Sequence, residues 1–264
     1  MDKPLVLLVN DDGIDSPGLV AAAEALLPLG RVVVAAPTMQ QTSMGRAYTG
    51  RRDATLQRVP FPLEGVEAYS IDASPAAVVR HAIFALQLPP VLVVSGINYG
   101  ENVGINVTAS GTVGATFEAV ERGLPGLAVS LEVDVASHHS YTKQDWSACI
   151  HFTRFFAARI LEKGMVPGAA ILKVEVPANA TPETPWKTRR ISTLPYYSLG
   201  IPFPRPDSSL SESLTLGKLP GIDEPADTDA YAIRTEKVVA VTPMTMDMTA
   251  YAAMENVVPW AREE

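Results

Sequence analysis

Short, continuously apolar segments alternate with segments of helical periodicity up to residue 176, and this alternation constrains the fold more than any other feature. Apolar runs of roughly four to eight residues are typical of strands that are buried on both faces. Two helical segments begin with a Ser-Pro pair, at Ser16 and Ser74, where Ser suits the cap and Pro suits the first turn. The sequence therefore predicts an α/β fold with a mostly parallel, Rossmann-like sheet and helices on both of its faces.

The predicted elements cover most of the chain. The strands are residues 4–9, 31–36, 66–71, 91–94, 127–132 and 169–176, and the helices are residues 16–27, 76–87, 112–123 and 145–163. Residues 177–225 are rich in proline and predict loops, extended arms or edge hairpins. Residues 229–243 again have a strand-like sequence, and residues 246–254 predict a terminal helix. We expect residues 1–264 to form a single domain.

Composition excludes several classes of function. The formal net charge of −8 excludes a stable nucleic-acid complex held by bulk electrostatics, because that mode of binding needs a basic surface. The apolar runs are too short to span a membrane, and no signal-peptide layout is visible. The single cysteine, Cys149, cannot form an internal disulfide. We therefore expect a soluble cytoplasmic protein.

Three polar clusters follow predicted strands, at the point where each strand ends. They are Asp11 with Asp12, Thr42 with Ser43, and residues 95–98, which end in Asn98. In an open parallel sheet, ligands bind beyond the carboxyl ends of the strands. We therefore expect the three clusters to meet at one edge of the sheet.

Asp11 and Asp12 are the strongest candidates for chemistry. Two adjacent carboxylates repel each other unless a cation lies beside them, and such oxygen ligands suit Mg²⁺, Mn²⁺ or Ca²⁺. The alternative is a simple Asp-Asp-Gly turn. The hydroxyls of Thr42 and Ser43 and the amide oxygen of Asn98 are neutral groups that can join such a site.

Phosphate-binding features accompany the acids. Gly96 would let the backbone approach a ligand closely. Ser110, Gly111 and Thr112 precede a predicted helix, whose N-terminus is a good seat for phosphate, although Ser and Thr are also routine helix caps. Arg46 could pair with a phosphate or remain solvated. The fingerprints of dinucleotide-binding and P-loop sites are missing from the sequence.

Taken together, these motifs resemble one known family. Residues 8–19 (LVNDDGIDSPGL), 94–102 (VSGINYGEN) and 110–115 (SGTVGA) are similar to motifs of the survival protein E (SurE) family. The match also includes residues 36–45, with weaker similarity at residues 227–229 and 241–243. The resemblance covers essentially the whole chain and is strongest over the first 120 residues.

The resemblance implies a SurE-like three-layer fold with an extended C-terminal arm or hairpin. It implies a divalent-metal phosphomonoesterase that hydrolyses nucleoside 5′-monophosphates, and 3′-monophosphates as well. It also implies a homodimer or homotetramer, for which residues 177–245 are the candidate oligomerisation region. The family's later strand carries Asn at two positions where this chain has Lys173 and Glu175.

The resemblance further implies roles for individual residues. One divalent cation, Mg²⁺ or Mn²⁺, would be held by Asp11, Asp12, Asn98 and a hydroxyl. The expected hydroxyl is Thr42, five residues after Pro37, with Ser43 as the alternative. Asp11, Asp12 and Asn98 would be catalytic. The phosphate or substrate would be bound by Ser43, Gly96, Asn98, Ser110, Gly111 and Thr112.

Two other functions fit parts of the sequence. A phosphatase with an aspartyl-phosphate intermediate needs Asp-x-Asp after its first strand, whereas here the acids are adjacent. A non-catalytic regulator that binds nucleotide or phosphate on the same fold is the second alternative, and the retained acids argue against it.

Overall fold

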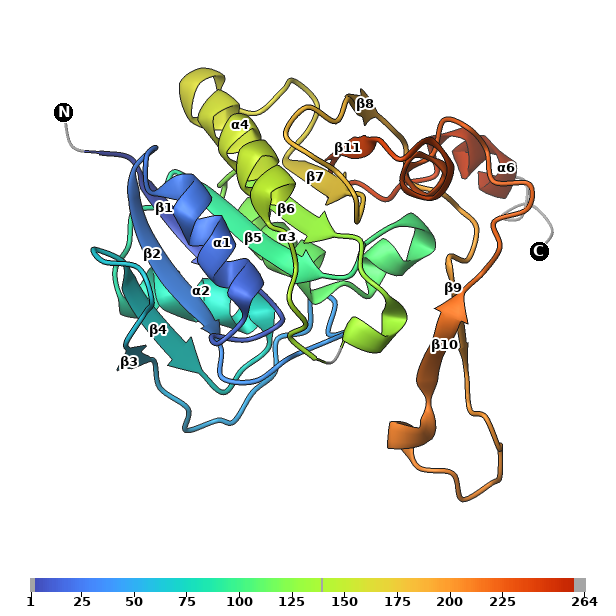
Figure 1. Cartoon of the computed structure of the whole chain (residues 1–264), viewed down its shortest axis with the longest axis horizontal. Helices are drawn as coiled ribbons and strands as arrows, with labels where there is room; N and C mark the ends of the chain where they lie inside the picture. The colour runs from blue at the N-terminus through green and yellow to red at the C-terminus, as the bar shows by residue number, and fades with distance from the viewer. Residues whose placement is uncertain (1–2, 139, 259–264) are drawn as a thin grey trace.

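The computed structural model describes residues 3–138 and 140–258 (Figure 1). Within these residues, nine strands form a sheet in the order β3-β4-β2-β1-β5-β6-β7-β11-β8, and β9 and β10 form a separate hairpin. Most neighbours in the sheet are parallel, whereas β3 with β4 and β7 with β11 are antiparallel. The mostly parallel sheet expected from the apolar runs is confirmed.

The strands are β1 (Leu5–Val9), β2 (Arg31–Pro37), β3 (Gln57–Val59), β4 (Glu67–Ile71), β5 (Leu92–Tyr99), β6 (Gly126–Leu131), β7 (Ile171–Val176), β8 (Trp186–Thr188), β9 (Tyr197–Gly200), β10 (Leu214–Lys218) and β11 (Val239–Met244). The longer helices are α1 (Pro17–Leu26), α2 (Pro75–Ala85), α3 (Gly111–Glu121) and α4 (Ser147–Lys163). Short helical turns are η1 (Gly104–Thr108), η2 (Val135–Ser137), η3 (Leu210–Glu212), α5 (Asp229–Tyr231), η4 (Ala232–Glu236), η5 (Tyr251–Ala253) and α6 (Met254–Val257). None of these helices, within the described ranges, combines the length and hydropathy that a membrane crossing requires.

The core lies on both faces of the sheet. Val6 and Leu8 of β1 belong to the apolar cluster that includes α1 and α4, whereas Leu7 and Val9 belong to the cluster that includes α2 and α3. Successive side chains of a strand point to opposite faces, so β1 must be apolar at every position. This explains why the buried strands have continuous rather than alternating apolar sequences.

Two sequence predictions were wrong in detail near the site. Residues 95–98 were expected in a loop, but β5 continues to Tyr99, with an irregular register against β6 between Ser95 and Asn98. Ser16 and Ser74 occupy the N-cap positions of α1 and α2, but among the described residues neither side chain makes a capping bond. Ser74 instead donates to Ala47 O (2.6 Å), which holds the loop after β2 against α2.

The C-terminal third differs most from expectation. Residues 229–243 were expected to be strand-like, but α5 and η4 precede β11. The terminal helix expected at 246–254 is confined to η5 and α6 at 251–257, and β3 was not predicted. The β9–β10 hairpin projects from the body of the molecule (Figure 1), as the proline-rich segment suggested. β8, from the proline-rich segment, and β11, which follows it, join the main sheet.

Candidate functional site

The loop after β1 presents the two acids. Asn10 closes this loop on itself, because its Nδ2 donates to Gly13 O (2.9 Å) and its Oδ1 accepts from Gly13 N (3.2 Å). Asp11 and Asp12 are 6% and 1% exposed. The turn that was the alternative reading of this motif is therefore present, and it carries both carboxyl groups into a buried position.

Asp11 is held by the first turn of α3. The Thr112 hydroxyl donates to its Oδ1 at 2.5 Å. Gly111 lies so close that a Cβ there would stand 2.8 Å from Asp11 Oδ2. Ser110 caps the helix by accepting a hydrogen bond from Val113 N at 3.1 Å. The helix start therefore serves both as a cap and as a support for the acid.

Asp12 is held from a different direction. Its Oδ2 accepts a hydrogen bond from Tyr99 N (3.0 Å), at the carboxyl end of β5. Gln40 Nε2 lies 3.4 Å from Asp12 Oδ1, and the Tyr141 hydroxyl donates to Asp12 O at 2.7 Å. Asp12 thus joins three segments that lie far apart in the sequence.

Burial disfavours charge on both acids. It raises the pKa of Asp11 to about 6, against the lowering effect of the Thr112 hydrogen bond. Burial and then the charge of Asp11 raise the pKa of Asp12 well above its usual value. A bound cation would remove this penalty, because it neutralises the repulsion that opposes ionisation.

The loop after β2 carries the two candidate hydroxyls. Gln41 N donates to Asp11 O (2.7 Å), which brings this loop against the acid loop. Thr42 and Ser43 both line the cavity beside Asp11, and Ser43 has a left-handed backbone (φ 62°). Arg46 points instead to α3, where it pairs with Glu118 at 3.2 Å. The structure thus favours an ion pair for Arg46 over phosphate binding.

Asn98 lies at the carboxyl end of β5 and lines the same cavity as Asp11. Its Nδ2 donates to Gly100 O at 2.7 Å, which leaves the amide oxygen as the atom available to a ligand. Gly96 lies further back in β5, where a Cβ would stand 2.2 Å from Val129 O. Its lack of a side chain is therefore required by the packing of β5 on β6.

A cavity of about 330 Å³ joins these groups. The predicted residues that line it are Asp11, Thr42, Ser43, Asn98 and Ser110. Asp12, Gly96, Gly111 and Thr112 are not among the described lining residues. Asp12 and Thr112 support the others through the hydrogen bonds above. The expected meeting of three polar clusters at one edge of the sheet is confirmed.

Sequence reasoning missed the rest of the lining. The cavity also includes Gln40, Asn106, His138, Tyr197, Leu199 and Thr215. Tyr197, Leu199 and Thr215 come from the β9–β10 hairpin. No local pattern marks these residues, because they reach the cavity only through tertiary contacts.

The donor set fits a hard divalent cation. Among the described residues, no cluster of three or more His, Cys, Asp and Glu side chains could hold a metal. The site offers two carboxylates, a hydroxyl and an amide oxygen instead. Oxygen donors of mixed charge are the ligands that Mg²⁺ and Mn²⁺ take, with water completing the shell.

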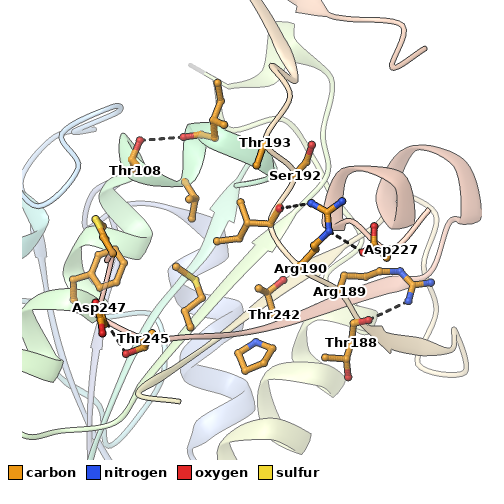
Figure 2. A pocket seen from close by; sticks show the side chains of 17 residues that line it. Thr108, Thr188, Arg189, Arg190, Ser192, Thr193, Asp227, Thr242, Thr245 and Asp247 are labelled. Atoms are coloured by element: carbon orange, nitrogen blue, oxygen red, sulfur yellow. Dashed lines mark hydrogen bonds and ion pairs between the residues drawn. The ribbon is translucent and has the colours of Figure 1, made fainter. Parts of the chain in front are cut away.

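Figure 2 shows a larger cavity, of about 840 Å³, whose lining includes neither Asp11 nor Asp12. Apolar side chains such as Phe117, Ile191 and Met244 line much of it, and at one end Arg190 Nε donates to Asp227 Oδ2 at 2.8 Å. None of its described lining residues was predicted for the site. We therefore place the candidate site in the smaller cavity, where the buried carboxylates lie.

Comparisons with known proteins identify the family that the chain resembles. Residues 6–196 match a family model described as survival protein SurE. The 5′-nucleotidase SurE of Thermococcus gammatolerans is 40% identical over 252 residues, which cover 95% of this chain and 93% of that protein. The 5′-nucleotidase SurE of Thermococcus kodakarensis is 40% identical over 263 residues and 96% of each chain.

A solved structure shows the same architecture. The crystal structure of the SurE protein from Aquifex aeolicus superposes with a TM-score of 0.77 at 26% sequence identity, covering 98% of this chain and 100% of that chain. The three-layer α/β fold implied by the sequence motifs is therefore confirmed.

Proposed function

Because the chain belongs to the survival protein SurE family, we propose that it hydrolyses nucleoside monophosphates to nucleoside and phosphate. The observation that carries the proposal is the buried Asp11, which lines one cavity with the hydroxyls of Thr42 and Ser43 and the amide of Asn98, while the adjacent Asp12 is buried beside it. We expect 5′-monophosphates to be substrates, and 3′-monophosphates as well.

We propose that one divalent cation, Mg²⁺ or Mn²⁺, is held by Asp11, Asp12, Asn98 and Thr42. Ser43 is the alternative to Thr42, since both hydroxyls line the cavity. When bound, such a cation would polarise a phosphate oxygen and lower the pKa of a coordinated water. The hydrogen bonds from Thr112 and from Tyr99 N keep the two carboxylates oriented for this purpose.

The remaining predicted residues are assigned to the phosphate. Ser43, Ser110 and Asn98 would contact its oxygens, and Gly111 and Thr112 would support the same surface. Gly96 is the exception, because it packs against Val129 O of β6 and does not line the cavity. The N-terminus of α3, which begins at Gly111, directs the backbone N–H groups of Gly111 and Thr112 to Asp11, and its positive dipole end favours negative charge nearby. This dipole and the hydroxyls of Ser43 and Ser110 would stabilise the negative charge on the phosphate as its bond to the sugar oxygen breaks.

A test of the function uses AMP and GMP with Mn²⁺, with phosphate release as the readout. We expect turnover by the native chain and its loss, by at least about 1,000-fold, in Asp11→Asn, because a neutral amide cannot replace the carboxylate. Circular dichroism should show an intact fold. Nucleotide binding without phosphate release would support the alternative of a non-catalytic regulator, and a trapped phosphoaspartate would support the aspartyl-phosphate alternative.

We also propose that the chain forms a homodimer or homotetramer through the 177–245 region. The projecting β9–β10 hairpin supports this, because an isolated two-stranded hairpin is marginally stable in water and gains from packing against another surface. Its exposed apolar side chains include Leu199, Phe203 and Leu216. Light scattering should give a mass of two or four chains for the native protein, and a monomer after deletion of the hairpin tip.

A further inference from the structure

One wall of the cavity is made of side chains that the proposed phosphate chemistry does not use. They are His138, from the segment after β6, and Tyr197, Leu199 and Thr215, from the β9–β10 hairpin. The lining of the cavity thus combines polar groups such as Asp11 and Asn98 with aromatic and apolar side chains. A pocket of about 330 Å³ is at the lower end of the range for small-molecule sites.

Tyr197 is held in a fixed position. Its hydroxyl donates to Glu101 O at 3.1 Å, in the loop that follows β5. Its partner across the hairpin is Lys218, whose Nζ lies 2.6 Å from Glu101 Oε1. The base of the hairpin is therefore joined twice to the same residue of the site loop, and the Tyr197 ring is preorganised beside the cavity.

His138 is tied to the acid pair as well. Its carbonyl accepts a hydrogen bond from Gln40 Nε2 at 2.6 Å, and the same Nε2 lies 3.4 Å from Asp12 Oδ1. The His138 ring lies edge-on to the Tyr197 ring, with centroids 5.6 Å apart and an interplanar angle of 88°. The His138 and Tyr197 rings thus form a corner whose position relative to the carboxylates is set by direct contacts.

We propose that the corner formed by His138 and Tyr197 binds the nucleobase of the substrate. This inference rests on the proposed function and deepens it, because it names the part of the chain that distinguishes a nucleotide from other phosphate monoesters. An aromatic face stacks on any base, so the corner favours nucleotides over sugar phosphates with little discrimination between bases. The hairpin is then a part of the substrate site.

The test compares AMP with ribose 5-phosphate, which has the same phosphate and sugar but no base. In Tyr197→Leu, the ratio of kcat/KM for AMP to kcat/KM for ribose 5-phosphate should fall roughly 5- to 150-fold, the range that corresponds to the loss of one stacked base. Most of the change should lie in KM for AMP. Tyr197→Phe keeps the ring and should retain more of this ratio than Tyr197→Leu.

The matched control is Tyr251→Leu, the same substitution at a tyrosine that is 67% exposed and lies outside both the hairpin and the cavity lining, for which both activities should stay at the native level. An equal loss on both substrates in Tyr197→Leu would show that Tyr197 only anchors the hairpin and would overturn the proposal. An unchanged ratio would overturn it too. If the native chain releases phosphate from neither compound with Mn²⁺, the proposed function itself fails, which is a separate outcome.

Discussion

The hydroxyl of Thr112 lies 2.5 Å from Oδ1 of Asp11 and joins the start of α3 to the loop after β1. Replacement of Thr112 by Val keeps the shape of the side chain but removes the donor. A hydrogen bond to a charged group contributes about 1.5–3 kcal/mol, so we expect kcat/KM for AMP to fall roughly 10- to 150-fold. Steady-state kinetics with Mn²⁺ measure this, and Thr112→Ser should restore much of the loss.

Thr116→Val is the control for that change, because Thr116 is a buried threonine of the same helix whose hydroxyl donates to Val113 O instead. It should keep native activity. Native activity in Thr112→Val would mean that the hydrogen bond has no part in placing Asp11.

Gly111 offers a steric test of the same contact. A Cβ at this position would stand 2.8 Å from both Cβ and Oδ2 of Asp11, so Gly111→Ala must displace the acid. Because small displacements of a reacting group are costly, we expect kcat/KM to fall by at least about tenfold. Gly217→Ala is the control, since nothing lies within 4 Å of a Cβ there. Equal activity of the two variants would contradict this prediction.

The raised pKa of Asp11 predicts a pH dependence in metal-free protein. Its pKa is about 6 in the folded chain and 3.8 in the reference state, so the folded chain binds more protons between these values. The Asp11 carboxyl therefore contributes to the free energy of unfolding at low pH, and this contribution is lost as the pH rises toward about 6. Urea denaturation in EDTA should show Asp11→Asn gaining stability relative to the native chain from pH 4 to pH 7.

Addition of Mn²⁺ at pH 7 should make the native chain more stable than Asp11→Asn, because the cation binds the ionised carboxylate of the native chain. A stability difference that does not change with pH would show that Asp11 titrates normally and is not destabilised by burial.

Lys173 lies at the centre of a buried ionic network. Its Nζ is 3.0 Å from Asp229 Oδ2 and 3.4 Å from Glu175 Oε1, and all three side chains are fully buried. Lys173→Met leaves both carboxylates without a cation and should lower the free energy of unfolding by about 3–5 kcal/mol. Glu175→Gln should cost less, because Lys173 and Asp229 remain paired. Urea denaturation at pH 7 measures both.

The exposed pair of Lys187 and Glu236, at 3.0 Å, is the matched control. Lys187→Met should change stability by less than about 1 kcal/mol, because water screens an exposed ion pair. A Lys173→Met variant as stable as this control would show that the buried carboxyls are protonated. The network also accepts the N–H of Asn102 and Gly104, so it supports the loop beside the cavity.

The sequence by itself determined the elements and the candidate chemistry. Apolar runs and helical periodicity are local properties, so strands such as β1 and helices such as α4 could be predicted within a few residues. The parallel sheet then required the carboxyl ends of β1, β2 and β5 to meet at one edge, which placed Asp11, Thr42 and Asn98 together.

Only the tertiary structure decided how the site is completed. Thr112 lies 101 residues from Asp11, and Tyr197 reaches the cavity from a hairpin whose local sequence suggests only an exposed arm. The same holds for Lys173, whose charge becomes part of the core through contact with Glu175 and Asp229. Such contacts depend on how separate elements pack against one another, and a pattern within a single segment carries no information about its distant neighbours.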